Sequence, residues 1–178
     1  VDRPLTFTLD DLLARDLVDA TVTLSCVSNE VGGHLVGNAV WTGVPLIELL
    51  EEVGVRPDGE QVMGRSVDGF SAGVPRSVLD DARTALVAVG MNGDPLPFRH
   101  GFPARLVIAG LYGYVSAVKW LEQIELTPMS VDGYWIPRGW AKEAPVKIAS
   151  RIDVPLRSQT VSGRQAVAGV AWAPVSGV

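Results

Sequence analysis

The sequence of 178 residues has a single cysteine, Cys26, and only two histidines. One cysteine cannot form an intramolecular disulfide, so a disulfide scaffold is excluded, as are cysteine-rich zinc and iron–sulfur sites. The histidines, His34 and His100, lack the spacing of a zinc motif with each other or with Cys26. Cys26 is therefore either a small buried side chain or a thiol that the chain delivers to a site.

Runs of like charge and long apolar stretches are also missing. The net charge is −5 and no run of five or more like charges occurs, so a nucleic-acid interface is not expected. No stretch approaches the roughly 20 apolar residues of a membrane-spanning helix, and no signal peptide opens the sequence. Both ends run directly into an expected strand or helix, so we expect a piece of a longer protein. The missing signals then say nothing of the parent's location.

Hydrophobic residues make up 47% of the chain, which is typical of an ordered core, and the length suits one main domain. Short strands and short helices mix without regular alternation, which predicts an α+β fold with mixed sheets. We expect the main domain over residues 1–155, and a linker with the truncated start of a second domain over 156–178. Strands are expected at 6–8, 20–27, 61–67, 84–91, 105–109, 118–126 and 165–173, and helices at 9–14, 45–53 and 75–83.

Two local signals are specific. Thr8 and Asp11 stand three residues apart at the start of an expected helix, which is the spacing of a capping box. Asn92 and Gly93 follow the apolar run at 84–91, and this pair is the strongest short hairpin signal.

A weak hydrolase signal is present. The segment GFSAG places Ser71 in a G-x-S-x-G pattern, and Asp94 and His100 follow in the order of an α/β-hydrolase. That serine should be followed at once by a helix, whereas a Val-Pro pair intervenes here, so a glycine-rich turn is the favoured interpretation. A thiol hydrolase that pairs Cys26 with His100 stays open as an alternative.

A local group of cations indicates phosphate binding. The segment RHGFPAR contains Arg99, His100 and Arg105, and Lys119 follows in GLYGYVSAVKW. Arginine can bind a phosphate through two parallel hydrogen bonds, and glycines let backbone N–H groups approach an anion. An ordinary hairpin end with surface cations is the alternative interpretation.

Five motifs in order carry a family resemblance: LSCVSN, MNGDPLP, HGFPAR, GLYGYVSAVKWL and RGWAKEAPVKIASRIDVP. Together they resemble the molybdopterin-binding domain of the sulfite oxidase superfamily, and in particular its bacterial oxidoreductases, over residues 1–155. The tail QAVAGVAWAP is similar to the opening strand of the immunoglobulin-like dimerisation domain that follows in many members.

The resemblance implies a role for several residues and a molybdenum–molybdopterin cofactor. Cys26 would ligate molybdenum through its thiolate, and a soft sulfur ligand suits a metal that changes oxidation state. Asn29, in the Cys-x-x-Asn pattern, would order the turn. The residues implied in binding the pterin and its phosphate are His100, Arg105, Lys119, Ser116 and Ser66, whereas Tyr112 and Tyr114 either line the pocket or pack.

Departures from the sulfite oxidase pattern bear on the substrate. Glu30 and Val31 stand where sulfite oxidases resemble one another in having arginines, and Glu30 would repel an anion such as sulfite. Phe70 stands at the position of the family's active-site tyrosine and lacks its hydroxyl. Glu30 and Phe70 are thus the candidate substrate-side residues, and sulfite oxidation is not expected.

The resemblance implies a domain that transfers an oxygen atom to or from a small substrate. Electrons would leave through another subunit or domain, haem- or quinone-linked, because no haem-binding segment is present. The parent is expected to be membrane-associated and dimeric, with this domain outside the cytoplasm. The pterin contacts that relatives take from a segment further upstream are missing here, so we expect the fragment to bind cofactor weakly or not at all and to be inactive on its own. Two alternatives stay open: a cofactor-free binding or structural module, and a serine or cysteine hydrolase.

Overall fold

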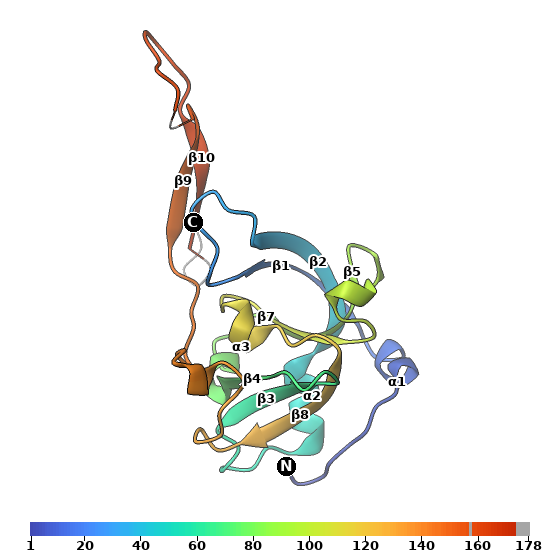
Figure 1. Ribbon diagram of the computed structural model, residues 1–178. Helices are drawn as coiled ribbons and strands as arrows, with labels where there is room; N and C mark the ends of the chain where they lie inside the picture. Colours follow the sequence, from blue (N-terminus) through green and yellow to red (C-terminus); the bar gives the residue numbers. More distant parts are fainter. Residues whose placement is uncertain (157, 174–178) are drawn as a thin grey trace.

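Two antiparallel β-sheets form the body of the molecule (Figure 1). The computed structural model describes residues 1–156 and 158–173. In the larger sheet the strand order is β1-β2-β5-β6, with β7 paired to β5, and in the smaller sheet it is β4-β3-β8. The larger sheet consists of β1 (Val18–Ser25), β2 (Val36–Pro45), β5 (Ala85–Met91), β6 (Asp94–Pro95) and β7 (Arg105–Ile108), and the smaller of β3 (Gln61–Ser66), β4 (Ser71–Pro75) and β8 (Leu121–Thr127).

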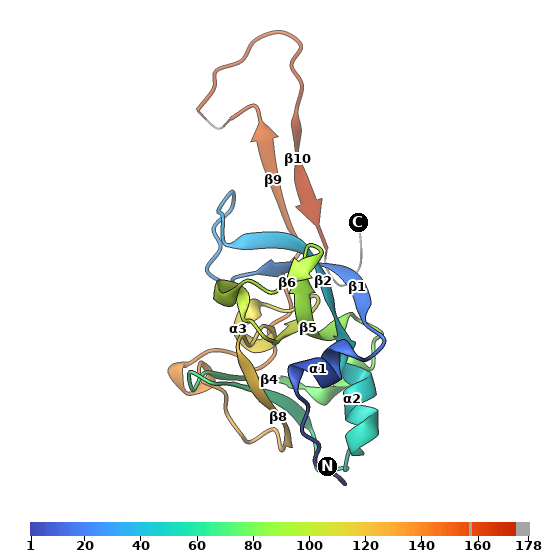
Figure 2. The same ribbon diagram turned by 90° about the vertical axis from the view of Figure 1, so that its right-hand side faces the viewer.

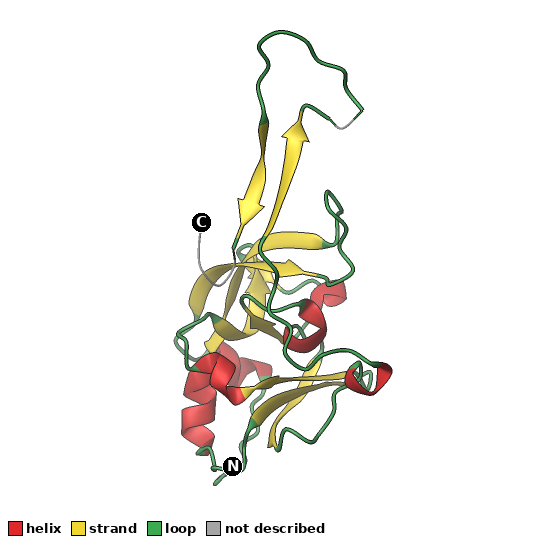
Figure 3. Ribbon diagram, turned by 90° about the vertical axis from the view of Figure 1, so that its left-hand side faces the viewer, coloured by secondary structure: helices red, strands yellow, loops and turns green. Residues whose placement is uncertain are grey.

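The helices are short and lie at the edges of the sheets (Figure 3). This arrangement confirms the α+β class with mixed sheets and short helices. No helix within the described residues is long and apolar enough to cross a membrane. The helices are α1 (Leu9–Leu13), α2 (Leu46–Val53) and α3 (Gly113–Ser116), with 3₁₀ turns at Arg76–Leu79, Phe98–His100 and Ile136–Arg138.

The main core lies between the two sheets, because strand alternation sends every second side chain to that face. Val87 and Leu106 of the larger sheet meet Val62 and Val74 of the smaller one there, and Leu46 of α2 packs into the same core with no exposed surface. A second apolar cluster covers the opposite face of the larger sheet, centred on Trp41, Ala88 and Val107.

A two-stranded ribbon of β9 (Ala149–Val154) and β10 (Ala168–Trp172) extends from this body. Both Figure 1 and Figure 2 show it projecting on the side opposite the N-terminus. Ile152 on β9 keeps 68% of its surface exposed, so the ribbon buries little beyond its own pairing. The expected domain boundary at residue 155 lies in the connection between the two strands and stays a prediction.

Both specific local signals are confirmed. The Thr8 hydroxyl accepts a hydrogen bond from the backbone N–H of Asp11, and the Asp11 carboxylate accepts one from the backbone N–H of Thr8. Asn92 and Gly93 both have positive φ, 56° and 85°, as a tight hairpin between β5 and β6 requires.

Several expected elements differ in the structure. Residues 6–8 form no strand, and the helix expected at 75–83 is only the 3₁₀ turn Arg76–Leu79. Strand β8 begins at Leu121 and not at 118, because Trp120 has a φ of +47°, which is incompatible with a strand. Strands β2, β4 and β9 were not expected, and the residues of β9 pair only with the distant β10.

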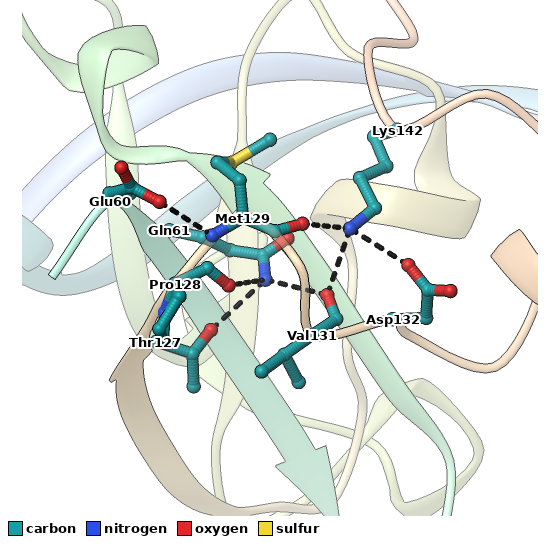
Figure 4. Close-up of polar contacts among 8 residues, drawn as sticks. All are labelled: Glu60, Gln61, Thr127, Pro128, Met129, Val131, Asp132 and Lys142. Carbon is teal, nitrogen blue, oxygen red and sulfur yellow. Dashed lines mark hydrogen bonds and ion pairs between the residues drawn. The ribbon is translucent and has the colours of Figure 1, made fainter. Parts of the chain in front are cut away.

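A buried polar network fixes the segment that follows β8 (Figure 4). The Gln61 amide, 1% exposed, donates to the Thr127 hydroxyl at 3.0 Å and to the Val131 carbonyl at 2.9 Å. The Lys142 ammonium donates to the Met129 and Val131 carbonyls and pairs with Asp132 at 2.8 Å. These contacts clamp the base of the aromatic loop 133–141 against the smaller sheet.

Candidate functional site

Cys26 lies directly after β1, where the alternation of the strand ends and the loop to β2 begins. Its backbone N–H donates to the Leu35 carbonyl at 2.9 Å, and its side chain is an exposed free thiol. The Asn29 side chain accepts a hydrogen bond from the Leu35 N–H at 2.7 Å, and the Asn29 N–H donates to the Cys26 carbonyl at 3.0 Å. Asn29 therefore orders the loop, as expected, and holds the thiol at a fixed place.

A small cavity of about 80 Å³ opens beside Cys26. One wall is the loop that carries Glu30, and a second wall comes from Tyr112 before α3, from β9 with the residues before it, and from Trp172 of β10. This second wall carries a phenol, an ammonium and a guanidinium group, those of Tyr112, Lys147 and Arg151. The structure thus places one carboxylate and two cationic side chains around the thiol.

Arg105 is the only buried charged residue of the described part of the chain, at 5% exposure. Its guanidinium donates to the His100 carbonyl at 2.9 Å and lies 4.8 Å from the ring centre of Trp41. No carboxylate pairs with it among the described residues, and burial lowers the pKa of Arg105 to about 10. The fold therefore holds a buried positive charge that a bound anion would neutralise.

The other expected phosphate-binding residues gather around Arg105. Burial, followed by the positive charges of Arg105, Arg99 and Lys119, lowers the pKa of His100. The Lys119 ammonium donates to the Arg99 carbonyl at 3.1 Å. Gly101 has a φ of +112°, and a Cβ there would lie 3.0 Å from that of Lys119 and 3.2 Å from that of Arg105. Glycine at this position thus allows the segments that carry Lys119 and Arg105 to approach each other closely.

The two serines expected to contact the pterin are engaged within the protein. Ser116 is fully buried, and its hydroxyl lies 3.1 Å from the Tyr112 carbonyl, to which it donates. Ser66 is 4% exposed, and its hydroxyl accepts a hydrogen bond from the Asp68 N–H at 3.4 Å. Their cofactor contacts stay predictions.

The two expected substrate-side residues lie apart. Glu30 lines the cavity beside Cys26, whereas Phe70 does not. The Phe70 ring packs against Tyr134, with ring centres 5.7 Å apart. This contact continues into a cluster of aromatic rings that also contains Trp135, Trp140 and Tyr114.

The nucleophile elbow expected for a serine hydrolase is absent around Ser71. This residue opens strand β4, which continues to Pro75, so no helix follows the serine. Asp94 is exposed on the short strand β6. The serine-hydrolase alternative is therefore wrong for this segment.

Sequence reasoning left Lys147 and Arg151 without a role and left Tyr112 undecided. All three line the Cys26 cavity, although more than 80 residues separate Cys26 from each of them in the sequence. The only signal that bore on Lys147 and Arg151 was their place in the last of the five motifs.

The comparison with known families settles the identity of the domain. A family model described as "Oxidoreductase molybdopterin binding domain" matches residues 1–135. The chain belongs to this family. It is therefore a molybdopterin-binding oxidoreductase domain. The chain is 34% identical over 142 residues to the uncharacterized oxidoreductase YuiH of Bacillus subtilis, and the match covers 79% of this chain and 68% of that protein.

Other relatives are longer. Human mitochondrial sulfite oxidase is 28% identical over 211 residues, which cover 96% of this chain and 38% of that protein. The crystal structure of the sulfane dehydrogenase SoxCD from Paracoccus pantotrophus matches with a TM-score of 0.75 and 26% identity, covering 97% of this chain and 51% of that one. The molybdopterin-binding domain thus spans about half or less of these two proteins, and its fold is that of a molybdopterin oxidoreductase.

The residues present fit a cofactor with a phosphate end and a metal end. Arg105 is a buried cation without a carboxylate partner among the described residues, and a phosphate would supply the missing negative charge. Cys26 presents an exposed thiol next to a cavity, and thiolate sulfur is a suitable ligand for a redox-active metal. Both ends lie on the larger sheet, where Trp41 contacts Arg105 and donates through its indole N–H to the Val22 carbonyl of β1 at 3.2 Å.

Proposed function

We propose that this domain holds molybdenum through Cys26 and the pterin phosphate through His100, Arg105 and Lys119. The parent protein would transfer one oxygen atom to or from a small substrate, with a change of two electrons. When bound, the molybdenum cofactor supplies the two-electron chemistry, and the protein supplies binding and orientation. The observation that carries the proposal is the unneutralised buried charge of Arg105 on the same sheet as the exposed Cys26 thiol.

Each residue has a defined task in this proposal. The Cys26 thiolate is the protein ligand, held by the loop that Asn29 orders. Arg105 offers its guanidinium from a buried position, and Lys119 adds a second cation that the Arg99 carbonyl and the Trp120 ring hold nearby. The cavity of about 80 Å³ beside Cys26 admits only a small substrate group.

The resemblance to the sulfite oxidase superfamily supports three further proposals. We propose that the parent is membrane-associated and dimeric, that this domain works outside the cytoplasm, and that a haem- or quinone-linked partner exchanges its electrons. Fractionation of cells that express the parent, with a size measurement of the solubilised protein, tests the first two. A parent found as a cytoplasmic monomer would contradict them.

Metal analysis tests the molybdenum proposal. The parent protein is expressed in molybdenum-replete cells, and its molybdenum content is measured by elemental analysis beside Cys26→Ser, Arg105→Met and the control Ser28→Ala. We expect about one molybdenum per wild-type and Ser28→Ala chain, and little in the other two, because each loses one end of the binding site. Absence of molybdenum from the wild-type parent would contradict the proposal, and so would full retention by Cys26→Ser.

A further inference from the structure

The cavity beside Cys26 has two walls of different charge. Glu30 belongs to the loop wall, and Tyr112, Lys147 and Arg151 belong to the second wall. Arg151 is already paired, because its Nε lies 2.9 Å from a carboxylate oxygen of Asp153. The second wall therefore offers hydrogen-bond donors to a bound group, and the loop wall offers an acceptor.

Tyr112 is held firmly at this wall. Its backbone N–H donates to the Ala144 carbonyl at 2.8 Å, and its own carbonyl accepts from the Ser116 hydroxyl. Its phenol oxygen accepts a hydrogen bond from the backbone N–H of Lys147 at 3.4 Å. Since the phenol is the acceptor in that contact, its proton is left to donate to a bound group.

Lys147 supplies the free charge of the wall. Its backbone is fixed by the contact with Tyr112, whereas its ammonium makes no ion pair within 4.0 Å in the described part of the chain. An ammonium attracts an approaching negative charge, and the effect is strongest where protein walls exclude part of the solvent. The carboxylate of Glu30 on the loop wall acts in the reverse sense.

We propose that Tyr112 and Lys147 form the oxygen-binding wall of the Cys26 cavity and receive the negatively polarised oxygen of the substrate. The inference rests on the proposed function, which places the reacting metal at Cys26. It also assigns to Tyr112 the hydroxyl that Phe70 cannot supply, since Tyr112 lines this cavity and Phe70 does not. Two classes of substrate, oxyanions and neutral oxides, carry a polarised oxygen of the kind that this wall would bind.

The charge of the wall can be measured on the metal-free chain, without enzyme activity. The Cys26 thiol is alkylated with anionic iodoacetate and, separately, with neutral iodoacetamide, and the ratio of the two rate constants is taken. Both reagents attack the same thiolate, so its ionised fraction cancels in the ratio. The ratio then reports only how the cavity treats a negative charge beside the sulfur.

Lys147→Gln should lower the iodoacetate-to-iodoacetamide ratio about threefold, and Glu30→Gln should raise it by a similar factor, at low salt. Lys147→Arg keeps the charge and should keep the ratio, and the control Arg56→Gln, in the loop after α2, should leave it unchanged. Tyr112→Phe should preserve the ratio but weaken protection of Cys26 by inorganic sulfate about three- to tenfold, through loss of one donor to a charged group.

An unchanged ratio in Lys147→Gln, or an equal change in Arg56→Gln, would overturn the assignment of Lys147. Undiminished sulfate protection in Tyr112→Phe would overturn that of Tyr112. If sulfate does not protect the wild-type thiol, oxyanions are excluded as ligands of the wall, and protection by dimethyl sulfoxide, a neutral oxide, becomes the deciding measurement. If neither compound protects the thiol, the proposal of an oxygen-binding wall is wrong. Because no metal is involved, these outcomes are separate from the molybdenum analysis.

Discussion

Replacing Arg105 by methionine should leave the cofactor-free fold as stable as the wild type, or more stable. Burial lowers the pKa of Arg105 from its usual high value to about 10, which corresponds to about 3 kcal/mol against the charged form. Arg105 is charged at every pH below about 10, so the penalty of burying its charge is fully present at neutral pH and is relieved only as the pH rises above about 10. The bond to the His100 carbonyl and the contact with Trp41 offset about 1–3 kcal/mol of this cost.

Methionine retains a flexible apolar chain of similar length without the charge. We therefore expect Arg105→Met to change the free energy of unfolding by less than about 2 kcal/mol, in the stabilising direction. The wild type should in addition be stabilised by inorganic phosphate, by about 1.8 kcal/mol at twenty times the dissociation constant. The variant should lose this response, because the buried cation that receives the anion is gone.

The assay is urea unfolding of the metal-free chain in phosphate and in chloride of equal ionic strength. Arg65→Met is the matched control, since Arg65 already pairs with Glu125 at 2.8 Å on the partly exposed face of β3. It should lose at most about 1 kcal/mol and keep the phosphate response. The reasoning would be refuted if Arg105→Met lost more than about 3 kcal/mol in chloride, or if it responded to phosphate like the wild type.

Three further predictions concern stability. Because burial and neighbouring cations depress the pKa of His100 below its usual 6.5, the metal-free chain should lose stability as the pH falls below about 6.5. His100→Gln should flatten that part of the curve of stability against pH. A curve as steep as that of the wild type would contradict the prediction. Gln61→Met should destabilise the fold by about 1–2 kcal/mol in urea unfolding, because the bonds from its buried amide to the Thr127 hydroxyl and the Val131 carbonyl are both lost while Lys142 still donates to that carbonyl, and a loss below about 0.5 kcal/mol would contradict it. Asn29→Ala should cost about 1 kcal/mol and speed hydrogen exchange of the Leu35 amide, whereas unchanged exchange would show that the side chain does not order the loop.

Patterns of local chemistry were sufficient to predict much of the fold. The capping box at Thr8 and the hairpin at Asn92 depend on neighbouring residues alone, so their sequence signals were decisive. Strand β9 could not be found in this way, because its pairing with β10 spans a connection of more than ten residues and its outward side chains are mostly exposed. The late start of β8 has a similar cause, since the positive φ of Trp120 accompanies a hydrogen bond from its indole to the distant Phe98 carbonyl.

The candidate site also has a part that could be predicted from local sequence patterns and a part that could not. The cluster around Arg105 comes from two segments that carry compact motifs, and the resemblance was enough to indicate it. The role of Lys147 was missed and that of Tyr112 was left open, because the two residues come together only when two segments meet. Tyr112 lies before α3, and its N–H and hydroxyl hold the chain at Ala144 and Lys147. Contacts between residues more than 30 positions apart leave no spacing signal in one sequence.

The strand order of the larger sheet sets the shape of the ligand that the site can hold. Cys26 follows β1 and Arg105 begins β7, with β2 and β5 between these strands. The register places Arg105 opposite Ala88, which pairs with Gly43, whereas Cys26 follows the Ser25–Val36 pair near the other end of β2. A metal ion or a phosphate alone can therefore fill only one end, whereas an elongated cofactor can fill both. It follows that Arg105→Met should remove the stabilisation of the fold by phosphate but leave the protection of Cys26 by sulfate unchanged, because that protection depends on Tyr112 and Lys147. If Arg105→Met abolished the sulfate protection of Cys26 together with the phosphate response, the two ends would be one site, and the division of labour between Cys26 and Arg105 would be wrong.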